Sequence, residues 1–389
     1  MSRTIFYISL NDLSAAPYPE VALPALVRNG WNITIIAPNA TRSAYRKHLP
    51  FACRSSDIPD YSWTRKELHL QFEMLKARMG RYDVIYINSQ MMGPRAAIAL
   101  AGPKLGGKYV FHAPDYFCPI EYPIRHYLDG RFSRKCQLYI NNEFHRGYLS
   151  YIHYRMKNTA ITAPPNLPAS WPIPQKSGGK RAEIDGGDPN AFVLSLHGGP
   201  SRLRHTTELC ASLKYLPKRF RIVMTGRTHA HDDFDKMLSE MGVADRVTRL
   251  PRLDFNDMLG YSINANAGVL LYRNSDLGNF FTAPGRITEY LACGLPVLGS
   301  NHTGLENLIL KYQLGTTAFA QDPLDIARSI TQLAKNVESG LHSAEHQRDV
   351  FLNYLAFDHW ESTVVDAFEQ LASNTLVPQR PTFPWIPLK

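Results

Sequence analysis

The chain of 389 residues is 44% hydrophobic and 20% charged, a globular composition that excludes a disordered or fibrous protein. Five cysteines occur singly and form no CxxC pair, so neither a structural zinc site nor a disulfide framework is indicated. No apolar stretch is long enough to span a bilayer, and the first apolar run, Ile5–Leu10, is too short for a signal-peptide core. We therefore expect two domains in a reducing cytoplasm, either soluble or held peripherally on the inner face of the plasma membrane.

The net charge of +9 lies entirely in the first half of the chain. Residues 1–165 contain 21 Lys and Arg against 11 Asp and Glu, whereas the remainder contains 22 against 23. A one-sided basic surface favours an anionic partner, which could be a lipid phosphate, a membrane face or a nucleic acid. A surface that only aids solubility is the alternative.

Apolar runs in the first half predict the strands of a parallel sheet, over 4–10, 31–37, 82–88 and 108–112. Helical periodicity over 21–27, 61–80 and about 96–100 places helices between them, and such strand–helix–strand units build parallel sheets. The segment 61–80 is basic outside its apolar face, so it either lies on a membrane surface or covers the sheet. No GxGxxG follows the first strand, which counts against a dehydrogenase.

Residues 121–160 interleave basic and aromatic side chains. The aromatic members are Tyr122, Tyr127, Phe132, Tyr139, Phe144, Tyr148, Tyr151 and Tyr154, and the basic ones are Arg125, Arg131, Arg134, Lys135, Arg146, Arg155 and Lys157. This composition suits either nucleic-acid binding by stacking and charge or a membrane interface. Within an α/β protein the membrane interface is the better fit, and no RNA-recognition motif is present.

A polar linker rich in Pro and Gly covers 169–190 and separates two α/β domains, over 1–168 and 191–354. The second domain has predicted strands over 191–196, 220–225, 246–250, 267–272 and 295–298. Predicted helices cover 202–216, 286–293, 325–337 and 349–371, with another beginning at 257. The fold class is therefore α/β, with two doubly wound, Rossmann-like domains.

The first strand of the second domain runs into the sequence His197-Gly198-Gly199-Pro200-Ser201. A strand, a Gly-Gly turn and a helix N-terminus together form a cradle for an anion. Arg202 and Arg204 begin the following helix, where cations oppose the helix dipole. Two arginines there are better explained by a bound anion, such as a phosphate, than by a solvated helix start.

The stretch 274–306 has the order loop, helix, strand, loop. Its helix follows Pro284 and Gly285, ends before Gly294, and carries Glu289 one turn in. A carboxylate there can accept hydrogen bonds from the hydroxyls of a sugar ring, whereas a solvated helix residue is the plain alternative.

The run E-Y-L-A-C-G-L-P-V over 289–297, with a Thr-Gly pair at 303–304, resembles the donor-site signature of GT-B glycosyltransferases, specifically the retaining family four. The resemblance implies two Rossmann-like domains that face each other across a cleft, and a C-terminal helix from about 355 that packs back on the first domain, with Trp360 as a candidate anchor. In that family a second glutamate lies eight residues before the first and contacts the donor sugar, but here that position is Phe281.

The resemblance also assigns roles to individual residues. Glu289 binds the ribose of a nucleotide sugar, and the diphosphate and base are held by Gly199, Arg202, Arg204, Arg227, Thr282, Ala283, Pro284, Gly285, Thr303 and Gly304. His112 and Asp115 are the catalytic candidates, with a satisfied structural histidine as the alternative for His112. Asn11 and Asp12 belong to the acceptor side. The family uses no metal or other cofactor, and no DxD motif occurs here.

The sequence thus predicts a retaining, metal-independent glycosyltransferase of hexosyltransferase type that uses a UDP- or GDP-linked sugar. The expected acceptor is a glycan or lipid-linked molecule of bacterial cell-surface polysaccharide synthesis, reached through the basic first half at an anionic membrane. Three alternatives stay open: a nucleotide-sugar 2-epimerase, an inactive partner subunit favoured by Phe281, and a nucleic-acid binder based on residues 121–160.

Overall fold

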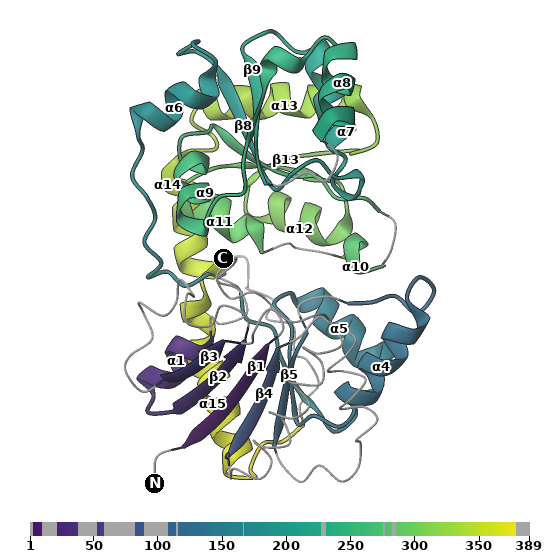
Figure 1. Cartoon of the computed structure of the whole chain (residues 1–389), viewed down its shortest axis with the longest axis vertical. Coiled ribbons are helices and arrows are strands. Elements are labelled where there is room, and N and C mark those ends of the chain that lie inside the picture. The colour runs from purple at the N-terminus through teal and green to yellow at the C-terminus, as the bar shows by residue number, and fades with distance from the viewer. Residues whose placement is uncertain are drawn as a thin grey trace. The chain divides into compact units, whose positions relative to one another are not determined.

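The computed structural model describes residues 3–9, 22–37, 53–57, 82–88, 108–113, 116–165, 167–226, 231–274, 277–281 and 285–378 (Figure 1). Its contacts divide the chain into two compact units. Unit 1 comprises residues 1–168 together with 356–389, and unit 2 comprises residues 169–355. The predicted helices over 61–80 and 96–100 lie outside the described residues.

Unit 1 contains a seven-stranded parallel sheet in the order β3-β2-β1-β4-β5-β6-β7. The strands are β1 (Thr4–Ser9), β2 (Asn32–Ala37), β3 (Cys53–Asp57), β4 (Val84–Asn88), β5 (Tyr109–His112), β6 (Leu138–Ile140) and β7 (Ala160–Thr162). Pairing aligns Ser9 with Asn88 and Asn88 with His112, so these polar residues meet at the carboxyl edge of the sheet.

Helices α1 (Ala22–Arg28), α4 (Pro123–Ser133), α5 (Phe144–His153) and α15 (Glu361–Ala372) accompany this sheet. Although α15 is remote in sequence, its Phe368 is fully buried in the core of unit 1 and meets the Trp31 ring edge-on. The Trp31 indole Nε1 donates a hydrogen bond to Glu369 at 2.8 Å. Trp360 is only half-buried, so Phe368 rather than Trp360 is the main aromatic anchor of the helix.

Unit 2 contains a six-stranded parallel sheet in the order β10-β9-β8-β11-β12-β13. The strands are β8 (Phe192–His197), β9 (Phe220–Thr225), β10 (Val247–Leu250), β11 (Ala267–Leu270), β12 (Val297–Ser300) and β13 (Gly315–Ala318). The helices are α6 (Gly178–Asp185), α7 (Thr206–Ser212), α8 (His231–Glu240), α9 (Phe255–Ser262), α10 (Leu277–Phe280), α11 (Arg286–Ala292), α12 (Thr303–Lys311), α13 (Pro323–Glu338) and α14 (Ala344–Val350).

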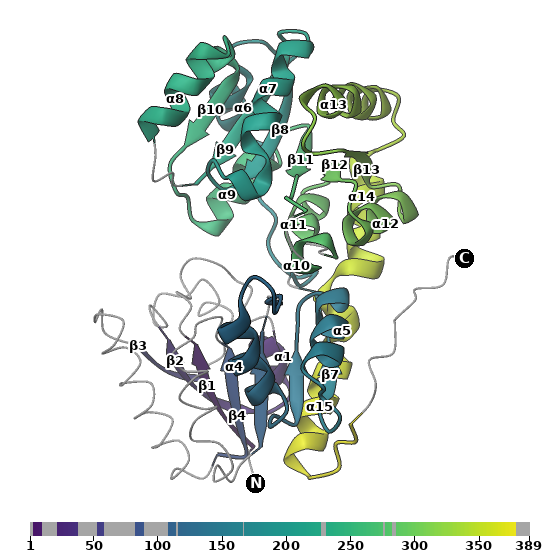
Figure 2. The ribbon, with the colours of Figure 1, turned by 90° about the vertical axis from the view of Figure 1, so that its right-hand side faces the viewer.

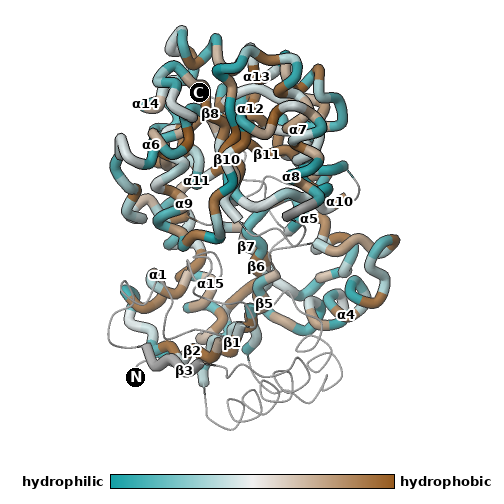
Figure 3. Tube along the Cα trace, turned by 45° about the horizontal axis from the view of Figure 1, so that its top comes forward, coloured by the Kyte–Doolittle hydropathy of each residue, from teal (hydrophilic) through white to brown (hydrophobic). Residues whose placement is uncertain are grey.

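Helices cover both faces of this second sheet. Apolar side chains of α7, α8 and α13 form one core with the strands. On the other face, α11 and α12 lie against β11 and β12 (Figure 2). The apolar residues are concentrated along the strands, whereas the helices alternate between polar and apolar positions (Figure 3). Buried parallel strands require this distribution, because both of their faces are covered.

Several predicted elements of unit 2 and the C-terminus differ from the structure. The helix predicted over 202–216 is interrupted at His205, which has a left-handed φ of 47° and separates a 3-10 turn (Arg202–Arg204) from α7. The linker predicted over 169–190 contains α6, and β12 begins two residues later than predicted. The helix predicted over 349–371 is divided into a π turn (Phe351–Leu355), a 3-10 turn (Phe357–Trp360) and α15. Within the described ranges, no helix has the length and hydropathy needed to cross a bilayer.

Candidate active site

The candidate site in unit 2 is built where β8 ends beside the first turns of α11. Tyr290 of α11 bridges the end of this strand, because its hydroxyl donates to the Ser195 carbonyl at 2.9 Å and accepts from the His197 amide at 3.0 Å. The helix can approach the sheet closely because Gly268 of β11 lies under the ring, where a Cβ would come within 2.3 Å of Tyr290. The tyrosine thus fixes the position of His197 relative to α11.

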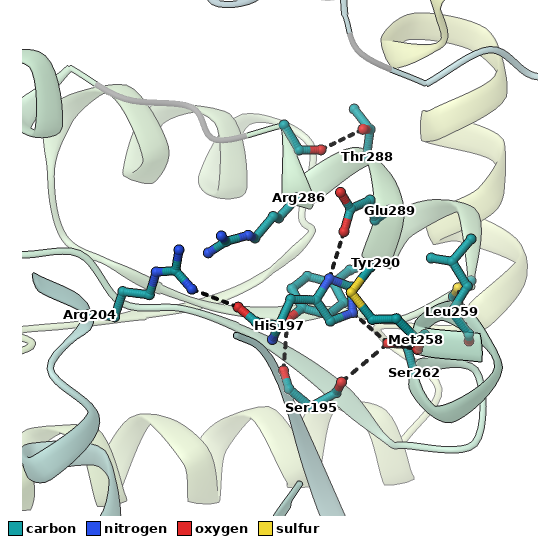
Figure 4. A network of polar contacts seen from close by, with 12 residues as sticks. Ser195, His197, Arg204, Met258, Leu259, Ser262, Arg286, Thr288, Glu289 and Tyr290 are labelled. Carbon is teal, nitrogen blue, oxygen red and sulfur yellow. Dashed lines mark hydrogen bonds and ion pairs between the residues drawn. The ribbon is translucent and has the colours of Figure 1, made fainter. Parts of the chain in front are cut away.

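Glu289 and His197 form a buried pair at the centre of the site (Figure 4). The Glu289 Oε2 lies 2.6 Å from the His197 Nδ1, and both residues are at most 2% exposed. The His197 Nε2 lies 2.5 Å from the hydroxyl of Ser262 in α9. That hydroxyl donates its hydrogen to the Met258 carbonyl at 3.0 Å. Three elements, β8, α9 and α11, therefore converge on one imidazole ring.

The hydrogen bonds of this pair imply one shared proton. With the Ser262 hydroxyl donating to the Met258 carbonyl, the His197 Nε2 carries a hydrogen and donates it to Ser262. A neutral imidazole then accepts at Nδ1, so the carboxyl of Glu289 must supply the hydrogen of that contact. The ionic alternative moves the same proton to His197, and in both cases one proton lies between the two side chains.

Burial favours the neutral arrangement of this pair. It raises the pKa of Glu289 to about 8. Burial, together with the nearby charges of Arg286 and Arg204, lowers the pKa of His197 well below its ordinary value. Near neutral pH the proton therefore resides on Glu289. The sequence predicted a carboxylate at this position, whereas burial in the structure favours the protonated carboxyl.

Two guanidinium groups stand beside the pair, and neither has an acidic partner in the part of the chain that the structure describes. Arg204 donates from Nη1 to the His197 carbonyl at 2.8 Å, and Arg286 donates to the Tyr272 hydroxyl at 3.3 Å. The two groups point toward each other (Figure 4). Burial, and secondly the charge of Arg286, lower the pKa of Arg204 to about 10. Neither arginine forms an ion pair with a carboxylate, so no negative charge among the described residues compensates them.

The Gly-Gly turn after β8 is shaped around Arg204. Gly198 has a φ of 113°, and a Cβ on it would lie 2.1 Å from the Arg204 Nη1. Gly226, after β9, has a φ of 151°, and a Cβ there would lie 2.7 Å from the Gly199 amide nitrogen. Both positions exclude larger residues, because a side chain would displace either the guanidinium or the turn.

The structure brings together some of the predicted donor residues. Gly199, Arg204, Gly285 and Glu289 lie around the end of β8 and the start of α11. The Arg202 side chain is exposed in the 3-10 turn. The pair at 303–304 is the first turn of α12 rather than a loop, and it follows His302.

The start of α12 lies near the turn that contains Arg204. The charge of His205, which follows Arg204 in the chain, lowers the pKa of His302, although burial is the larger cause. The predicted donor residues Arg227, Thr282, Ala283 and Pro284 lie outside the described residues.

Sequence reasoning missed several residues of this site. Arg286 could have been found, because a cation in the first turn of a helix opposes the dipole, as was argued for Arg202 and Arg204. His197 and Ser262 gave no usable signal, because their contact with Glu289 depends on how β8, α9 and α11 pack together.

In unit 1, His112 lies at the carboxyl edge of the sheet, as predicted, and is 1% exposed. Its Nδ1 is 2.9 Å from the Tyr86 hydroxyl, and its Nε2 hydrogen-bonds the Asn142 side chain. Burial lowers the pKa of His112 to about 4, so the ring is neutral at physiological pH. Its two ring nitrogens have protein partners, as expected of a satisfied structural histidine. Asn11, Asp12 and Asp115 lie outside the described residues.

No protein-family model matches this chain, and no curated protein matches its sequence. Solved structures do resemble it. A sucrose-phosphate synthase from Thermosynechococcus elongatus has a TM-score of 0.72 at 15% identity, over 96% of this chain and 100% of that chain. HepE from Anabaena, in complex with UDP-glucose, has a TM-score of 0.69 at 15% identity, over 95% and 99%. A putative UDP-N-acetylglucosamine 2-epimerase from Listeria monocytogenes has a TM-score of 0.62 at 10% identity, over 98% and 99%.

These likenesses cover nearly the whole chain and agree with two parallel α/β units in tandem. The chain therefore has the GT-B fold of glycosyltransferases, as the sequence predicted. The putative UDP-N-acetylglucosamine 2-epimerase shares the same fold, so the fold alone does not select the reaction.

Proposed function

We propose that this protein is a glycosyltransferase that moves a sugar from a nucleotide-diphosphate donor to a glycan or lipid-linked acceptor, with retention of anomeric configuration. The observation that carries the proposal is the facing pair of Arg204 and Arg286, which has no carboxylate partner in the described part of unit 2. Uncompensated guanidinium groups beside a Gly-Gly turn form a site for a diphosphate. The adjacent carboxyl of Glu289 suits the hydroxyls of the attached ribose.

In this proposal the donor binds at the carboxyl edge of the second sheet. Arg204, Arg286 and the turn at Gly199 hold the diphosphate, with Arg202 as a peripheral cation. The backbone at Gly285 and the first turn of α12 complete the contacts. The two inner guanidinium groups stabilise the negative charge that grows on the leaving diphosphate. Because these arginines supply the positive charge that the leaving diphosphate needs, we propose that the reaction is metal-independent.

The acceptor is proposed to meet unit 1. Because burial keeps His112 neutral, this residue would act by hydrogen bonding a sugar hydroxyl rather than by donating a proton, and it would exchange its Asn142 contact to do so. Asp115 and residues 11–12 are proposed for the same side. These assignments rest on the family resemblance and on the position of His112 at the carboxyl edge of its sheet.

An exposed stripe on α4 supports a membrane-borne acceptor. Ile124 and Tyr127 of α4 are 65% and 57% exposed, and their spacing of three residues places them on one face of the helix, while Ile120, in the turn before α4, is 88% exposed. Arg131 continues this face and donates from Nη1 to the Tyr127 hydroxyl at 3.2 Å. Aliphatic, tyrosine and arginine side chains on one face suit the interface of an anionic bilayer. We therefore propose a role in bacterial cell-surface polysaccharide synthesis at the cytoplasmic face of the membrane.

Thermal unfolding with UDP, GDP and ADP, each free and as a sugar conjugate, tests the donor site. A nucleotide at a hundred times its dissociation constant should stabilise the protein by about 2.7 kcal/mol. Arg204→Met should abolish the stabilisation. Arg219→Met is the matched control, because Arg219 precedes β9 at the opposite edge of the sheet and pairs with Glu338 at 2.7 Å. Stabilisation by no nucleotide, or equal loss in both variants, would contradict the proposal.

A nucleotide-sugar 2-epimerase is the second candidate, because a solved epimerase of this fold matches the chain. Nuclear magnetic resonance of UDP-N-acetylglucosamine incubated with the protein separates the possibilities. Inversion at C2 of the sugar identifies an epimerase, whereas slow release of free sugar without inversion identifies a transferase that lacks its acceptor. An inactive partner subunit would give neither product.

A further inference from the structure

Among the described residues, only one oxygen of the Glu289 carboxyl has a hydrogen-bond partner. Oε2 contacts His197, whereas Oε1 is directed away from that ring (Figure 4) and has no partner among the described residues. The side chain of a glutamate has three rotatable bonds. A carboxyl group with no hydrogen bond at either oxygen would therefore not keep one orientation. The direction of the second oxygen is therefore set by the contact at the first.

His197 is fixed more firmly than Glu289. Its amide donates to Tyr290, its carbonyl accepts from Arg204, and its two ring nitrogens meet Glu289 and Ser262. The Tyr290 ring also packs against the imidazole, with centroids 4.3 Å apart. Rotation of the imidazole would break at least two of these contacts inside a buried site, where unpaired polar groups are costly.

We propose that His197, anchored by Ser262, is the positioning residue that orients the carboxyl of Glu289, so that its second oxygen accepts hydrogen bonds from the ribose hydroxyls of the donor. The inference rests on the proposed function for the identity of the ligand. It goes beyond that function because it assigns nucleotide affinity to a residue that touches no part of the nucleotide.

The charged groups around the pair come from two elements. Arg204 enters from the 3-10 turn after β8, and Arg286 enters from α11. Two other titratable neighbours, Tyr290 and Cys293, stay protonated because burial raises the pKa of both well above their ordinary values. None of these groups competes with His197 for the Glu289 Oε2, so the imidazole is the side chain that holds that oxygen.

Two substitutions of His197 separate orientation from packing. In His197→Asn the amide occupies the place of Nδ1, so the contact with Glu289 survives and the contact with Ser262 is lost. In His197→Gln the amide reaches the place of Nε2, so the contact with Ser262 survives and the contact with Glu289 is lost. Glutamine is closer to histidine in volume than asparagine is, so a purely structural role predicts the larger loss of stability and affinity for His197→Asn, the reverse of the order expected here.

Calorimetric titration with UDP, or with whichever nucleotide stabilises the wild type, is the first measurement. We expect His197→Asn to bind within about threefold of the wild type and His197→Gln to bind at least about tenfold more weakly, the cost of one oriented hydrogen bond. His342→Asn is the matched control, because His342 is also buried in unit 2 and bonds Asn336 at 3.1 Å. Equal affinities of the two His197 variants, or losses that only follow their melting temperatures, would overturn the inference.

Infrared spectroscopy provides a second test of the positioning role, one that needs no nucleotide. The carboxylic-acid carbonyl band of Glu289 is assigned by its disappearance in Glu289→Gln. We expect that band to keep its frequency in His197→Asn and to shift in His197→Gln, which lacks the partner of Oε2. An unshifted band in His197→Gln refutes the positioning role. Failure of the wild type to bind any nucleotide would instead refute the proposed function, while the infrared result still decides the role of His197.

Discussion

We expect the Glu289–His197 pair to make the wild type less stable as pH rises from 6.5 to 8. Glu289→Gln should not show this decrease. The folded pair of Glu289 and His197 holds one proton up to about pH 8, since burial raises the pKa of Glu289 to that value and that of His197 is far lower. In the unfolded chain the two side chains titrate near their ordinary values of 4.5 and 6.5. The pH dependence of stability follows from counting protons in the two states.

Between pH 4.5 and 6.5 the unfolded chain holds one proton on the histidine, as the folded pair does on Glu289, so this pair contributes no pH dependence. Above pH 6.5 the unfolded chain holds none, and the folded state binds the extra proton. Stability therefore falls as pH rises, by about 1.4 kcal/mol per pH unit, until the folded pair releases its proton near pH 8. The loss over this window is about 2 kcal/mol.

Glutamine is the matched variant, because its amide can donate to the His197 Nδ1 as the protonated carboxyl does, yet it cannot ionise. Urea unfolding of unit 2 can be followed by pulse labelling of Cys210 and Cys293 and mass spectrometry, because both thiols are buried in that unit. The unfolding free energy of the wild type minus that of Glu289→Gln should fall by about 2 kcal/mol from pH 6.5 to pH 8. Parallel curves would refute the shared proton, since Glu289 would then already be ionised at pH 6.5.

Two other substitutions test the anion site and the exposed stripe. Gly198→Ala should weaken nucleotide binding at least about tenfold, because the new Cβ would lie 2.1 Å from the Arg204 Nη1. Gly340→Ala is the control and should leave affinity unchanged, because Gly340 also has a positive φ, of 81°, but has open space around it. Titration calorimetry checks this pair, and equal affinities would contradict the shape assigned to the turn. Ile124→Glu should reduce binding to phosphatidylglycerol vesicles at low salt by about tenfold, whereas Leu310→Glu, which changes a residue of α12 that is 60% exposed, should not. Vesicle co-sedimentation measures the binding of each variant, and equal binding by both would exclude α4 from contact with the membrane.

Most strands could be predicted because a buried parallel strand is a continuous apolar run. The runs at 4–10, 191–196 and 220–225 agree with β1, β8 and β9 to within a residue at each end. No strand range was predicted for β3, β6, β7 or β13. β3, with the sequence CRSSD, is an edge strand with a neighbour on one side only and therefore needs no apolar pattern. β6 has three residues, too few for any period to appear.

Local backbone effects explain other differences. The break after Arg204 depends on a left-handed conformation at His205, a residue type for which sequence gives little warning. The split at residues 351–360 places a π turn and a 3-10 turn where side-chain periodicity alone predicts one helix. The helix inside the predicted linker was missed because its sequence, GGKRAEID, begins with two glycines, which weaken a helix. Tertiary contacts such as that of Arg181 with the Ala191 carbonyl, at 2.6 Å, hold it in place.

The candidate site likewise contains residues that a local sequence pattern indicates and contacts that no local pattern indicates. Gly199, Arg204 and Glu289 were found because a Gly-Gly turn after a strand, a cation at a helix start and a carboxyl one turn into a helix are local patterns. The contact of His197 with Glu289 joins residues 92 positions apart, and it exists because β8 and β11 pair while α11 packs over them. No local rule contains that information.

The ionisation state of Glu289 is the point on which sequence reasoning and structure differ most, and it bears on how the site would treat a diphosphate. Arg204 and Arg286 would favour a carboxylate nearby, but the loss of hydration on burial outweighs them and keeps the proton in place. A neutral carboxyl beside two guanidinium groups leaves their whole charge available to phosphate oxygens, whereas a carboxylate would neutralise part of it and repel the ligand. A bound diphosphate should in turn make ionisation of Glu289 still harder, so nucleotide binding and retention of this proton should reinforce each other.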